Sequence, residues 1–150
     1  MGLIDAPDYL TAFVSQIAGS YADSTKIRID VGVHEVSLDL ARATTAGLII
    51  DELVTNSFKC AFPAGFDCMS VRGEPCSISV SLNAGAGTYV LSVADNGRGL
   101  PGGFDPLATK SLGLRLVNFL ARHQLRAEIE VRKDKGTEFI FRMSNAEEFR

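Results

Sequence analysis

Three polar residues share one stripe of a helix that the sequence predicts over residues 40–61. Glu52, Asn56 and Lys59 are spaced i, i+4 and i+7, so their side chains project from the same side. An amide oxygen can bind Mg²⁺, a lysine can neutralise phosphate oxygens, and a carboxylate can orient or deprotonate an attacking group. Taken alone, the stripe is more typical of a solvated helix face.

A second group of residues, Asp-Asn-Gly-Arg-Gly at 95–99, follows an apolar strand pattern and opens a glycine-rich loop. Asp95 is expected at the end of a sheet, where Gly97 and Gly99 permit close approach of the backbone to a ligand. A carboxylate there can accept a hydrogen bond from the exocyclic amine of adenine. Guanine has a carbonyl at that place, which would leave the carboxylate unpaired at a cost of about 1–3 kcal/mol. The alternative is an ordinary type I′ or type II turn.

A third segment stands where the loop passes into the next predicted helix. It comprises Lys110, Ser111, Leu112, Gly113 and Leu114. A helix N-terminus presents free N–H groups and a positive dipole end to phosphate, and Gly113 would let a triphosphate approach the backbone. The alternative is a serine-capped helix with a tolerated glycine, although glycine in the first turn lowers helix stability. Further along, Thr137 can donate a hydrogen bond near a bound base or simply follow a hairpin turn.

The elements that position these residues follow from hydrophobic periodicity. Helices are predicted over 8–21 with Asp8 as N-cap, over 40–61, and over 112–124 with Ser111 as N-cap. Strands are predicted over 27–33, 77–82, 88–93, 127–132 and 137–143, with a short segment near 36–38. The stretch 95–110 holds four glycines and two prolines, which is typical of a lid or binding loop. This order predicts an α+β fold with about three main helices on one face of a mixed sheet.

Length and composition indicate one globular domain over residues 1–150. A chain of 150 residues buries roughly 70% of its unfolded surface, which is enough for a core. A net charge of -3 gives no basic surface for nucleic acid, so no nucleic-acid partner is expected. The apolar stretches are too short to span a bilayer, and Asp5 and Asp8 stand where a signal peptide would be basic. We expect a cytoplasmic domain without direct membrane contact.

The cysteines give no sign of a disulfide framework or a zinc site. Cys60, Cys68 and Cys76 are odd in number and lack paired C-x-x-C spacing or neighbouring histidines. Reduced thiols are therefore expected at all three positions.

Taken in order, four segments resemble the nucleotide-binding motifs of the histidine kinase catalytic domain. This domain belongs to the ATPase superfamily that includes gyrase B, Hsp90 and MutL. The segment DELVTNSFKCAFP resembles the asparagine-bearing helix motif, and VADNGRG resembles the first glycine motif. The segment SLGLRLV resembles the second glycine motif, and KGTEF resembles the closing Gly-Thr motif. The resemblance covers residues from about 26 to 143. It implies the Bergerat-type (GHKL ATPase) fold, a two-layer α/β sandwich with an ATP lid over residues 97–112.

The resemblance also implies a role for each site residue. Asn56 would coordinate Mg²⁺, while Glu52 and Lys59 would flank the phosphates of ATP as the catalytic residues. Asp95 would read adenine, and Phe104 would belong to the lid. The remaining nucleotide-binding positions would be Gly97, Gly99, Lys110, Ser111, Leu112, Gly113, Leu114 and Thr137.

Three departures from the family pattern stand out. Cys60 replaces the usual histidine or aromatic residue, Asp51 replaces a common asparagine, and residues 66–75 resemble an insertion. The first departure puts one contact near the nucleotide in doubt without affecting the pocket as a whole.

The two histidines do not fit the role of a phosphoacceptor. His34 follows a predicted strand and His123 lies near the end of the post-lid helix, whereas such acceptors lie on a long dimerising helix. We therefore expect a catalytic fragment in which residues 1–25 are the end of a linker and the first helix, without sensor or phosphoacceptor domains. The expected partners are a histidine-containing dimerisation domain, in cis in a homodimeric full-length protein, and then a response-regulator receiver domain.

Other functions on this fold remain open at this point. A serine kinase of anti-sigma factors shares the pocket on one short domain, and a gyrase- or Hsp90-type clamp would need a transducer domain that does not follow here. A degenerate adaptor would keep the fold without nucleotide. Intact Asn56, Asp95 and the motif glycines argue against the adaptor.

Overall fold

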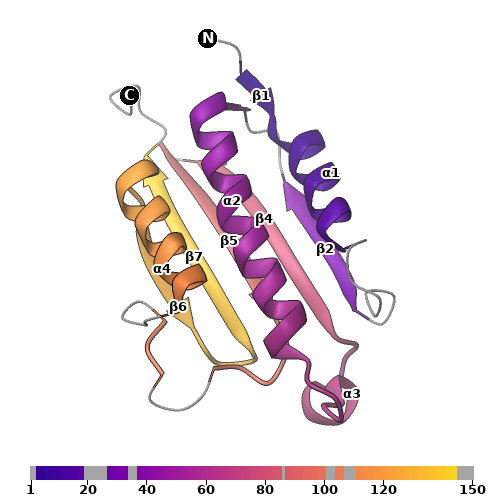
Figure 1. The fold of residues 1–150 in the computed structure, drawn as a ribbon. Coiled ribbons are helices and arrows are strands. Elements are labelled where there is room, and N and C mark those ends of the chain that lie inside the picture. Colours follow the sequence, from indigo (N-terminus) through magenta and orange to yellow (C-terminus); the bar gives the residue numbers. More distant parts are fainter. Residues whose placement is uncertain are drawn as a thin grey trace.

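Helices cover one face of a mixed five-stranded sheet (Figure 1). The computed structural model describes residues 3–18, 27–33, 37–85, 87–100, 104–106 and 111–144. The two layers make the α/β sandwich that the sequence predicts. No helix in these ranges has the length and apolar character that a bilayer span requires.

The main sheet consists of β2 (Arg28–Val33), β4 (Ser77–Gly85), β5 (Thr88–Asp95), β6 (Glu128–Arg132) and β7 (Thr137–Ser144). Its strand order is β2-β4-β5-β7-β6, with β2 parallel to β4 and the other pairs antiparallel. The register places Asp95, at the end of β5, opposite Thr137, at the start of β7. Two residues predicted to contact the base therefore meet at the same end of the sheet.

The helical layer contains α1 (Ala6–Ala18), α2 (Leu40–Asn56) and α4 (Leu112–Phe119), with a short α3 (Cys68–Arg72). Both α2 and α4 continue into a π-helical turn, Ser57–Ala61 and Leu120–Gln124 respectively. Asp39 caps α2 by accepting a hydrogen bond from the backbone N–H of Arg42 at 2.8 Å. The predicted helices 40–61 and 112–124 are thus confirmed.

The N-terminal region differs from the prediction. Strand β1 (Leu3–Asp5), which the sequence did not suggest, pairs antiparallel with β3 (Ser37–Asp39). Helix α1 begins at Ala6, directly after β1, so the prediction of Asp8 as its N-cap was wrong. Asp8 instead lies in the first turn, where a carboxylate still interacts favourably with the helix dipole. The predicted end of this helix at residues 19–21 lies outside the described residues.

The hydrophobic core lies between the helices and the sheet. The largest fully buried side chains are Leu10, Val14, Ile49, Ile50, Val54, Ile78, Val80, Leu82, Leu91, Val117, Leu125 and Phe141. Helix α2 packs against α1 on one side and α4 on the other, as Figure 1 shows. This three-helix layer places the C-terminal end of α2 over the end of the sheet at which β5 ends.

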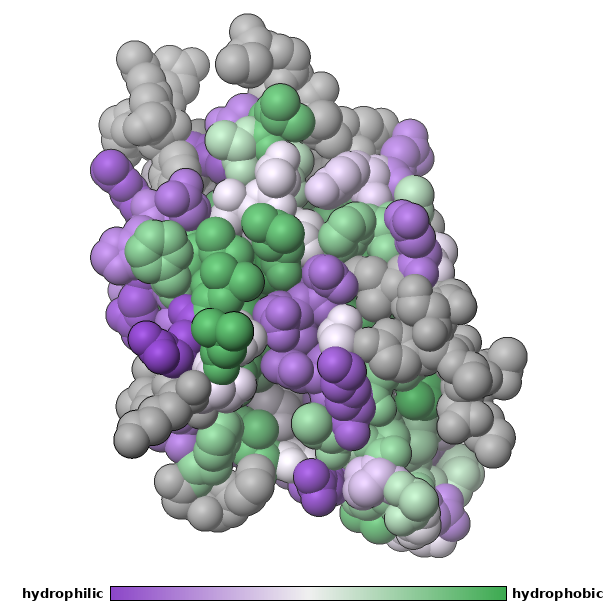
Figure 2. Space-filling view, in the orientation of Figure 1, coloured by the Kyte–Doolittle hydropathy of each residue, from purple (hydrophilic) through white to green (hydrophobic). Residues whose placement is uncertain are grey.

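The outer face of α4 carries apolar side chains that remain exposed. Leu112, Leu116 and Phe119 follow the spacing i, i+4 and i+7, and Leu48 on α2 is also exposed. Figure 2 shows hydrophobic side chains gathered over this part of the helical layer. Helix α4 thus uses its inner side, with Leu114 and Val117, for the core and presents a second apolar stripe at the surface.

The segment between α2 and β4 corrects the expectation of three reduced thiols. Cys68 and Cys76 form a disulfide, with Cα atoms 5.3 Å apart, while Cys60 is a free and exposed cysteine. Gly73, in the left-handed conformation at φ 78°, ends α3 and reverses the chain. The reversal brings together two cysteines that are eight residues apart in sequence. Counting cysteines could not detect this pairing.

Candidate nucleotide-binding site

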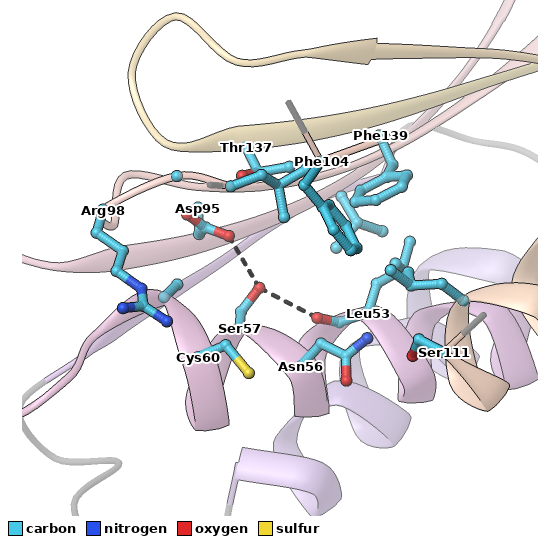
Figure 3. A pocket seen from close by; sticks show the side chains of 15 residues that line it. Leu53, Asn56, Ser57, Cys60, Asp95, Arg98, Phe104, Ser111, Thr137 and Phe139 are labelled. Carbon is cyan, nitrogen blue, oxygen red and sulfur yellow. Dashed lines mark hydrogen bonds between the residues drawn. The ribbon is translucent and has the colours of Figure 1, made fainter. Parts of the chain in front are cut away.

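A pocket of about 290 Å³ opens between the C-terminal end of α2 and the end of the sheet where β5 ends and β7 begins. Six residues predicted for the site line it, namely Asn56, Asp95, Gly99, Ser111, Leu114 and Thr137. Its walls are largely apolar, with contributions from Leu53, Val93, Leu100, Phe104 and Phe139. In Figure 3, Phe104 points between the sheet and α2. A few polar groups among apolar walls are typical of a small-molecule or cofactor site.

The carboxylate of Asp95 is held in place by hydrogen bonds from different elements. Its Oδ1 accepts a hydrogen bond from the backbone N–H of Gly97 at 2.9 Å, and its Oδ2 lies 3.1 Å from Oγ of Ser57. The Ser57 hydroxyl also lies 3.1 Å from the carbonyl oxygen of Leu53, as the dashed lines in Figure 3 show. Because a hydroxyl has one hydrogen, it donates to only one of these acceptors at a time. The hydroxyl can therefore release Oδ2 without losing its own acceptor.

Burial raises the pKa of the Asp95 carboxyl above its usual value, because desolvation disfavours the ionised form. The hydrogen bonds from Gly97, Ser57 and Thr137 oppose this shift, since they stabilise the carboxylate. The positive charge of Arg72 opposes the shift as well. A desolvated carboxylate with preset donors discriminates strongly between a ligand that donates a hydrogen bond and one that does not.

The π-helical turn at the end of α2 shapes one side of the pocket. A π-helical turn holds more residues than an α-helical turn, and such turns often occur at functional sites. Here Ser57, Cys60 and Ala61 of this turn all line the pocket. The carbonyl of Ala61 also accepts a hydrogen bond from the backbone N–H of Arg98 at 2.9 Å, which ties the helix end to the loop after β5.

Gly97 lies where this loop passes closest to the helix. A Cβ atom built at Gly97 would overlap the carbonyl oxygen of Ala61. The glycine therefore permits the contact between the loop and the helix end, which is a packing role beside the predicted role of shaping the pocket. Gly97 itself is not among the residues that line the pocket.

Two predicted residues meet where α4 crosses α2. Gly113, in the first turn of α4, faces Glu52, and a Cβ atom there would overlap the carboxylate of Glu52. The overlapping atoms lie at the flexible end of the Glu52 side chain, so Gly113 gives this carboxylate room beside the first turn of α4, and neither residue lines the pocket. Ser111 occupies the N-cap position of α4, as predicted, but its side chain makes no capping hydrogen bond and instead lines the pocket.

The remaining predicted residues lie further from the pocket. Lys59 and Leu112 are exposed and do not contribute to the lining, and Lys110 lies outside the described residues. The predicted stripe of Glu52, Asn56 and Lys59 is therefore divided, with only Asn56 at the pocket. The π-helical turn explains the position of Lys59, because it rotates the residues after Asn56 relative to α-helical spacing.

Residues 104–106 of the predicted lid are tied to the domain by hydrogen bonds to two backbone carbonyls. Nζ of Lys133 donates to the carbonyl of Phe104 at 3.0 Å, and Nδ2 of Asn118 donates to the carbonyl of Pro106 at 3.2 Å. Residues 101–103 and 107–110 of the lid lie outside the described ranges. The anchored stretch is the one that places the Phe104 ring in the pocket.

The histidine that the structure describes lies apart from the pocket lining. His123 is exposed in the π-helical turn after α4, and its ring centroid lies 4.9 Å from that of Phe119. His34 belongs to the residues that the structure does not describe.

Several residues that line the pocket were missed in the sequence. Ser57 and Arg98 bring polar atoms to it, and Leu53, Leu100 and Phe139 contribute apolar surface. Leu53 and Ser57 flank the predicted asparagine motif, so their sequence position was the available signal. Phe139 lies two residues after Thr137 on the same strand, so the alternation of side chains along a strand was the available signal for it.

Comparison with known proteins places the chain in a family. A family model of histidine kinase-, DNA gyrase B-, and HSP90-like ATPases matches residues 41–147. The sensor histidine kinase PdtaS of Mycobacterium tuberculosis is 33% identical over 116 residues, which cover 76% of this chain and 21% of PdtaS. PdtaS of Mycolicibacterium smegmatis is 31% identical over 121 residues, which cover 79% of this chain and 23% of that protein. The chain thus spans about a fifth of the length of these relatives.

Solved structures agree with this assignment at the level of the fold. The histidine kinase domain of the Erythrobacter litoralis EL346 blue-light activated histidine kinase superposes with a TM-score of 0.78 at 24% identity, covering 94% of this chain and 61% of that chain. The catalytic domain of histidine kinase ThkA gives a TM-score of 0.67 at 17% identity, with 96% and 97% covered. The chain therefore belongs to the family of histidine kinase-, DNA gyrase B- and HSP90-like ATPases.

Proposed function

We propose that this domain binds ATP·Mg²⁺ and donates the γ-phosphoryl group to a histidine on a separate dimerisation domain of a sensor histidine kinase. A response-regulator aspartate would then receive the phosphoryl group. The observation that carries the proposal is the Asp95 carboxylate in the lining of a largely apolar pocket, where hydrogen bonds from Gly97 and Ser57 hold it. Membership of the ATPase family supports the same ligand.

Adenine recognition follows from the chemistry of Asp95. The exocyclic amine of adenine donates a hydrogen bond, and the Asp95 carboxylate is an acceptor in a desolvated position. When the amine donates to the carboxylate, the Ser57 hydroxyl can turn to the carbonyl of Leu53. The purine ring would lie against apolar side chains such as Phe104 and Phe139.

The phosphates would extend toward Asn56 and the start of α4, because these lie on the side of the pocket away from the sheet (Figure 3). The first backbone N–H groups of α4 have no partners within the helix, so they can bind phosphate oxygens. Glu52 and Lys59 would act from the rim, with Lys59 neutralising charge and Glu52 assisting the attacking imidazole.

The donor set around Asn56 fits Mg²⁺ as a partly protein-bound ion. Among the described residues, no group of three or more His, Cys, Asp or Glu side chains could hold a metal by itself. Mg²⁺ keeps several waters and binds phosphate oxygens with only one or two protein ligands, so the Asn56 amide oxygen suffices. When bound, the ion would neutralise charge that develops on the phosphate oxygens. Asn56 would orient it, and Phe104 would help to exclude water.

A helical partner suits the surface beside the pocket. The exposed stripe of Leu112, Leu116 and Phe119 lies on the helix that follows the lid. An apolar stripe at helical spacing supports docking of the dimerisation domain, because a second amphipathic helix can cover it.

Phosphotransfer in trans tests this proposal. The chain is incubated with radiolabelled ATP and Mg²⁺, alone and with an isolated helical-hairpin domain that carries the acceptor histidine. We expect acid-labile label on the hairpin and none on the chain, with slow transfer because the tether is absent. Acid-stable label would indicate a serine kinase of the same superfamily, and acid-labile label on the chain alone would make it a self-contained kinase.

A further inference from the structure

We propose that Arg72 is a positioning residue for base recognition, because it holds the Asn96–Gly97 segment that orients the carboxylate of Asp95. The proposal rests on the proposed function, since it assigns base selectivity at the same pocket to a residue outside the pocket lining. Arg72 is the last residue of α3, which lies beyond the C-terminal end of α2 (Figure 1).

Arg72 binds two consecutive backbone carbonyls of the turn after β5. Its Nε donates to the carbonyl of Asn96 at 3.3 Å, and its Nη2 donates to the carbonyl of Gly97 at 2.7 Å. A guanidinium is planar and always charged, so it can bridge two acceptors in a fixed geometry. The backbone N–H of Gly97 in turn donates to Oδ1 of Asp95 at 2.9 Å. Arg72 is thus connected to Asp95 through a single residue.

The side chain of Asn96 fastens the same turn to the chain just before β4. Asn96 is buried, and its Oδ1 accepts a hydrogen bond from the backbone N–H of Ser77 at 2.8 Å. Its Nδ2 donates to the carbonyl of Pro75 at 2.8 Å and lies 3.4 Å from Oε1 of Glu74. The turn that carries Asp95 is therefore held by residues 72–77 on the side away from α2.

Helix α3 itself is short, and three features hold it and the residues that follow it in place. Asp67 caps it by accepting hydrogen bonds from the N–H of Met69 at 3.0 Å and the hydroxyl of Ser70 at 2.8 Å. The Cys68–Cys76 disulfide joins the first residue of α3 to the chain just before β4. The carbonyl of Cys76 accepts a hydrogen bond from the N–H of Arg28 at 2.8 Å, which joins the segment to β2. Arg72 is thus presented from a closed loop anchored to the sheet.

This arrangement separates base recognition from phosphate binding. Asp95 discriminates a base by whether it carries a hydrogen-bond donor, and its orientation depends on Gly97 and hence on Arg72. The side chain of Arg72 donates to the carbonyls of Asn96 and Gly97 in the turn after β5, whereas we assign the phosphates to the start of α4. Loss of the Arg72 contacts should therefore reduce selectivity for adenine without weakening triphosphate binding in general.

The test compares ATP with inosine triphosphate, whose base has a carbonyl in place of the adenine amine. Dissociation constants for both are measured for the wild type, Arg72→Ala, Arg72→Lys and the control Arg132→Ala, an exposed arginine on β6. We expect the wild type and the control to prefer ATP by about tenfold or more. Arg72→Ala should lower this ratio by about threefold or more through weaker ATP binding, and Arg72→Lys, which cannot bridge both carbonyls, should lie between them.

A second arm tests the role of the disulfide on the unmodified chain. Dithiothreitol breaks the S–S bond: two electrons and two protons give two thiols, and the dithiol becomes a cyclic disulfide. Thiol titration should then find three free cysteines instead of one. Reduction should lower the ATP preference of the wild type in the same direction as Arg72→Ala. The Cys68→Ser/Cys76→Ser variant should show the lowered preference with and without reductant.

The outcomes distinguish the two proposals. A wild-type chain that binds neither nucleotide would refute the proposed function. Wild-type selectivity that changes by less than about threefold in Arg72→Ala, or an equal loss of affinity for both nucleotides, would refute the positioning role alone. Thermal unfolding without nucleotide shows whether Arg72→Ala is folded. If it is not folded, the test rests on Arg72→Lys and on the reduced wild type. Unchanged selectivity after verified reduction would contradict the contribution of the disulfide.

Discussion

The hydroxyl of Ser57 lies 3.1 Å from Oδ2 of Asp95, which links the π-helical end of α2 to the end of β5. Both residues line the pocket, whose walls are largely apolar. The contact also gives the base-reading group a donor that can turn away to the carbonyl of Leu53. The pocket is therefore preorganised for a ligand that donates to Asp95.

Removing this hydroxyl should lower both the stability of the domain and its affinity for ATP. Ser57→Ala is expected to lower the free energy of unfolding by about 1 kcal/mol, because a buried donor to a carboxylate is lost. Affinity for ATP should fall by less than about tenfold, since the adenine amine still finds its acceptor. Chemical denaturation and calorimetry measure the two effects, with Ser81→Ala on β4 as the matched control. If Ser57→Ala changes neither the pKa of the Asp95 carboxyl nor the affinity of the domain for ATP, the assigned contact is contradicted.

The raised pKa of Asp95 predicts a specific pH dependence of stability. Because burial raises this pKa in the folded state, the folded chain holds a proton that the unfolded chain has released once the pH exceeds the ordinary value of 3.8. The free energy of unfolding therefore decreases as the pH rises from that value through the folded pKa. Asp95→Asn lacks this titration, so its melting temperature relative to the wild type should rise as the pH increases above 3.8. Parallel pH profiles for the two proteins would contradict the raised pKa.

The metal assignment makes a prediction about Mg²⁺ and not about folding. Asn56→Ala removes the amide oxygen at the pocket, so Mg²⁺ should no longer strengthen ATP binding and phosphotransfer should be lost. Calorimetric titrations with ATP in the presence and absence of Mg²⁺ compare this variant with Asn83→Ala, an exposed asparagine on β4. Equal strengthening by Mg²⁺ in Asn56→Ala and the control would show that Asn56 is not the ligand.

Much of this fold was predictable because local patterns of apolar residues determine most of its helices and strands. Alternating apolar residues such as Ile78, Val80 and Leu82 define the central strands, and all three are fully buried as expected. Asp95 and Thr137 were identified because each stands at a strand end, next to glycines. Strand pairing then brought these two residues into register, which no local pattern specifies.

The features that sequence did not reveal depend on tertiary packing. The π-helical turn at Ser57–Ala61 has the same residue types as an ordinary helix, so the rotation of Lys59 away from Asn56 could not be anticipated. The disulfide between Cys68 and Cys76 requires the chain reversal at Gly73. The close contact between Gly113 and Glu52 arises from the crossing of two helices that lie sixty residues apart.

Calorimetric titration of the unmodified chain with ATP and with GTP, each with Mg²⁺, tests the central claim most directly. The account predicts one ATP site of modest affinity, at least about tenfold weaker binding of GTP, and a loss of about 1.4 kcal/mol or more of ATP binding free energy in Asp95→Asn. This variant should melt near the wild-type temperature without nucleotide at acidic pH, where the wild-type carboxyl is protonated. Equal affinity for ATP and GTP, or no binding of ATP at millimolar concentration, would contradict the account.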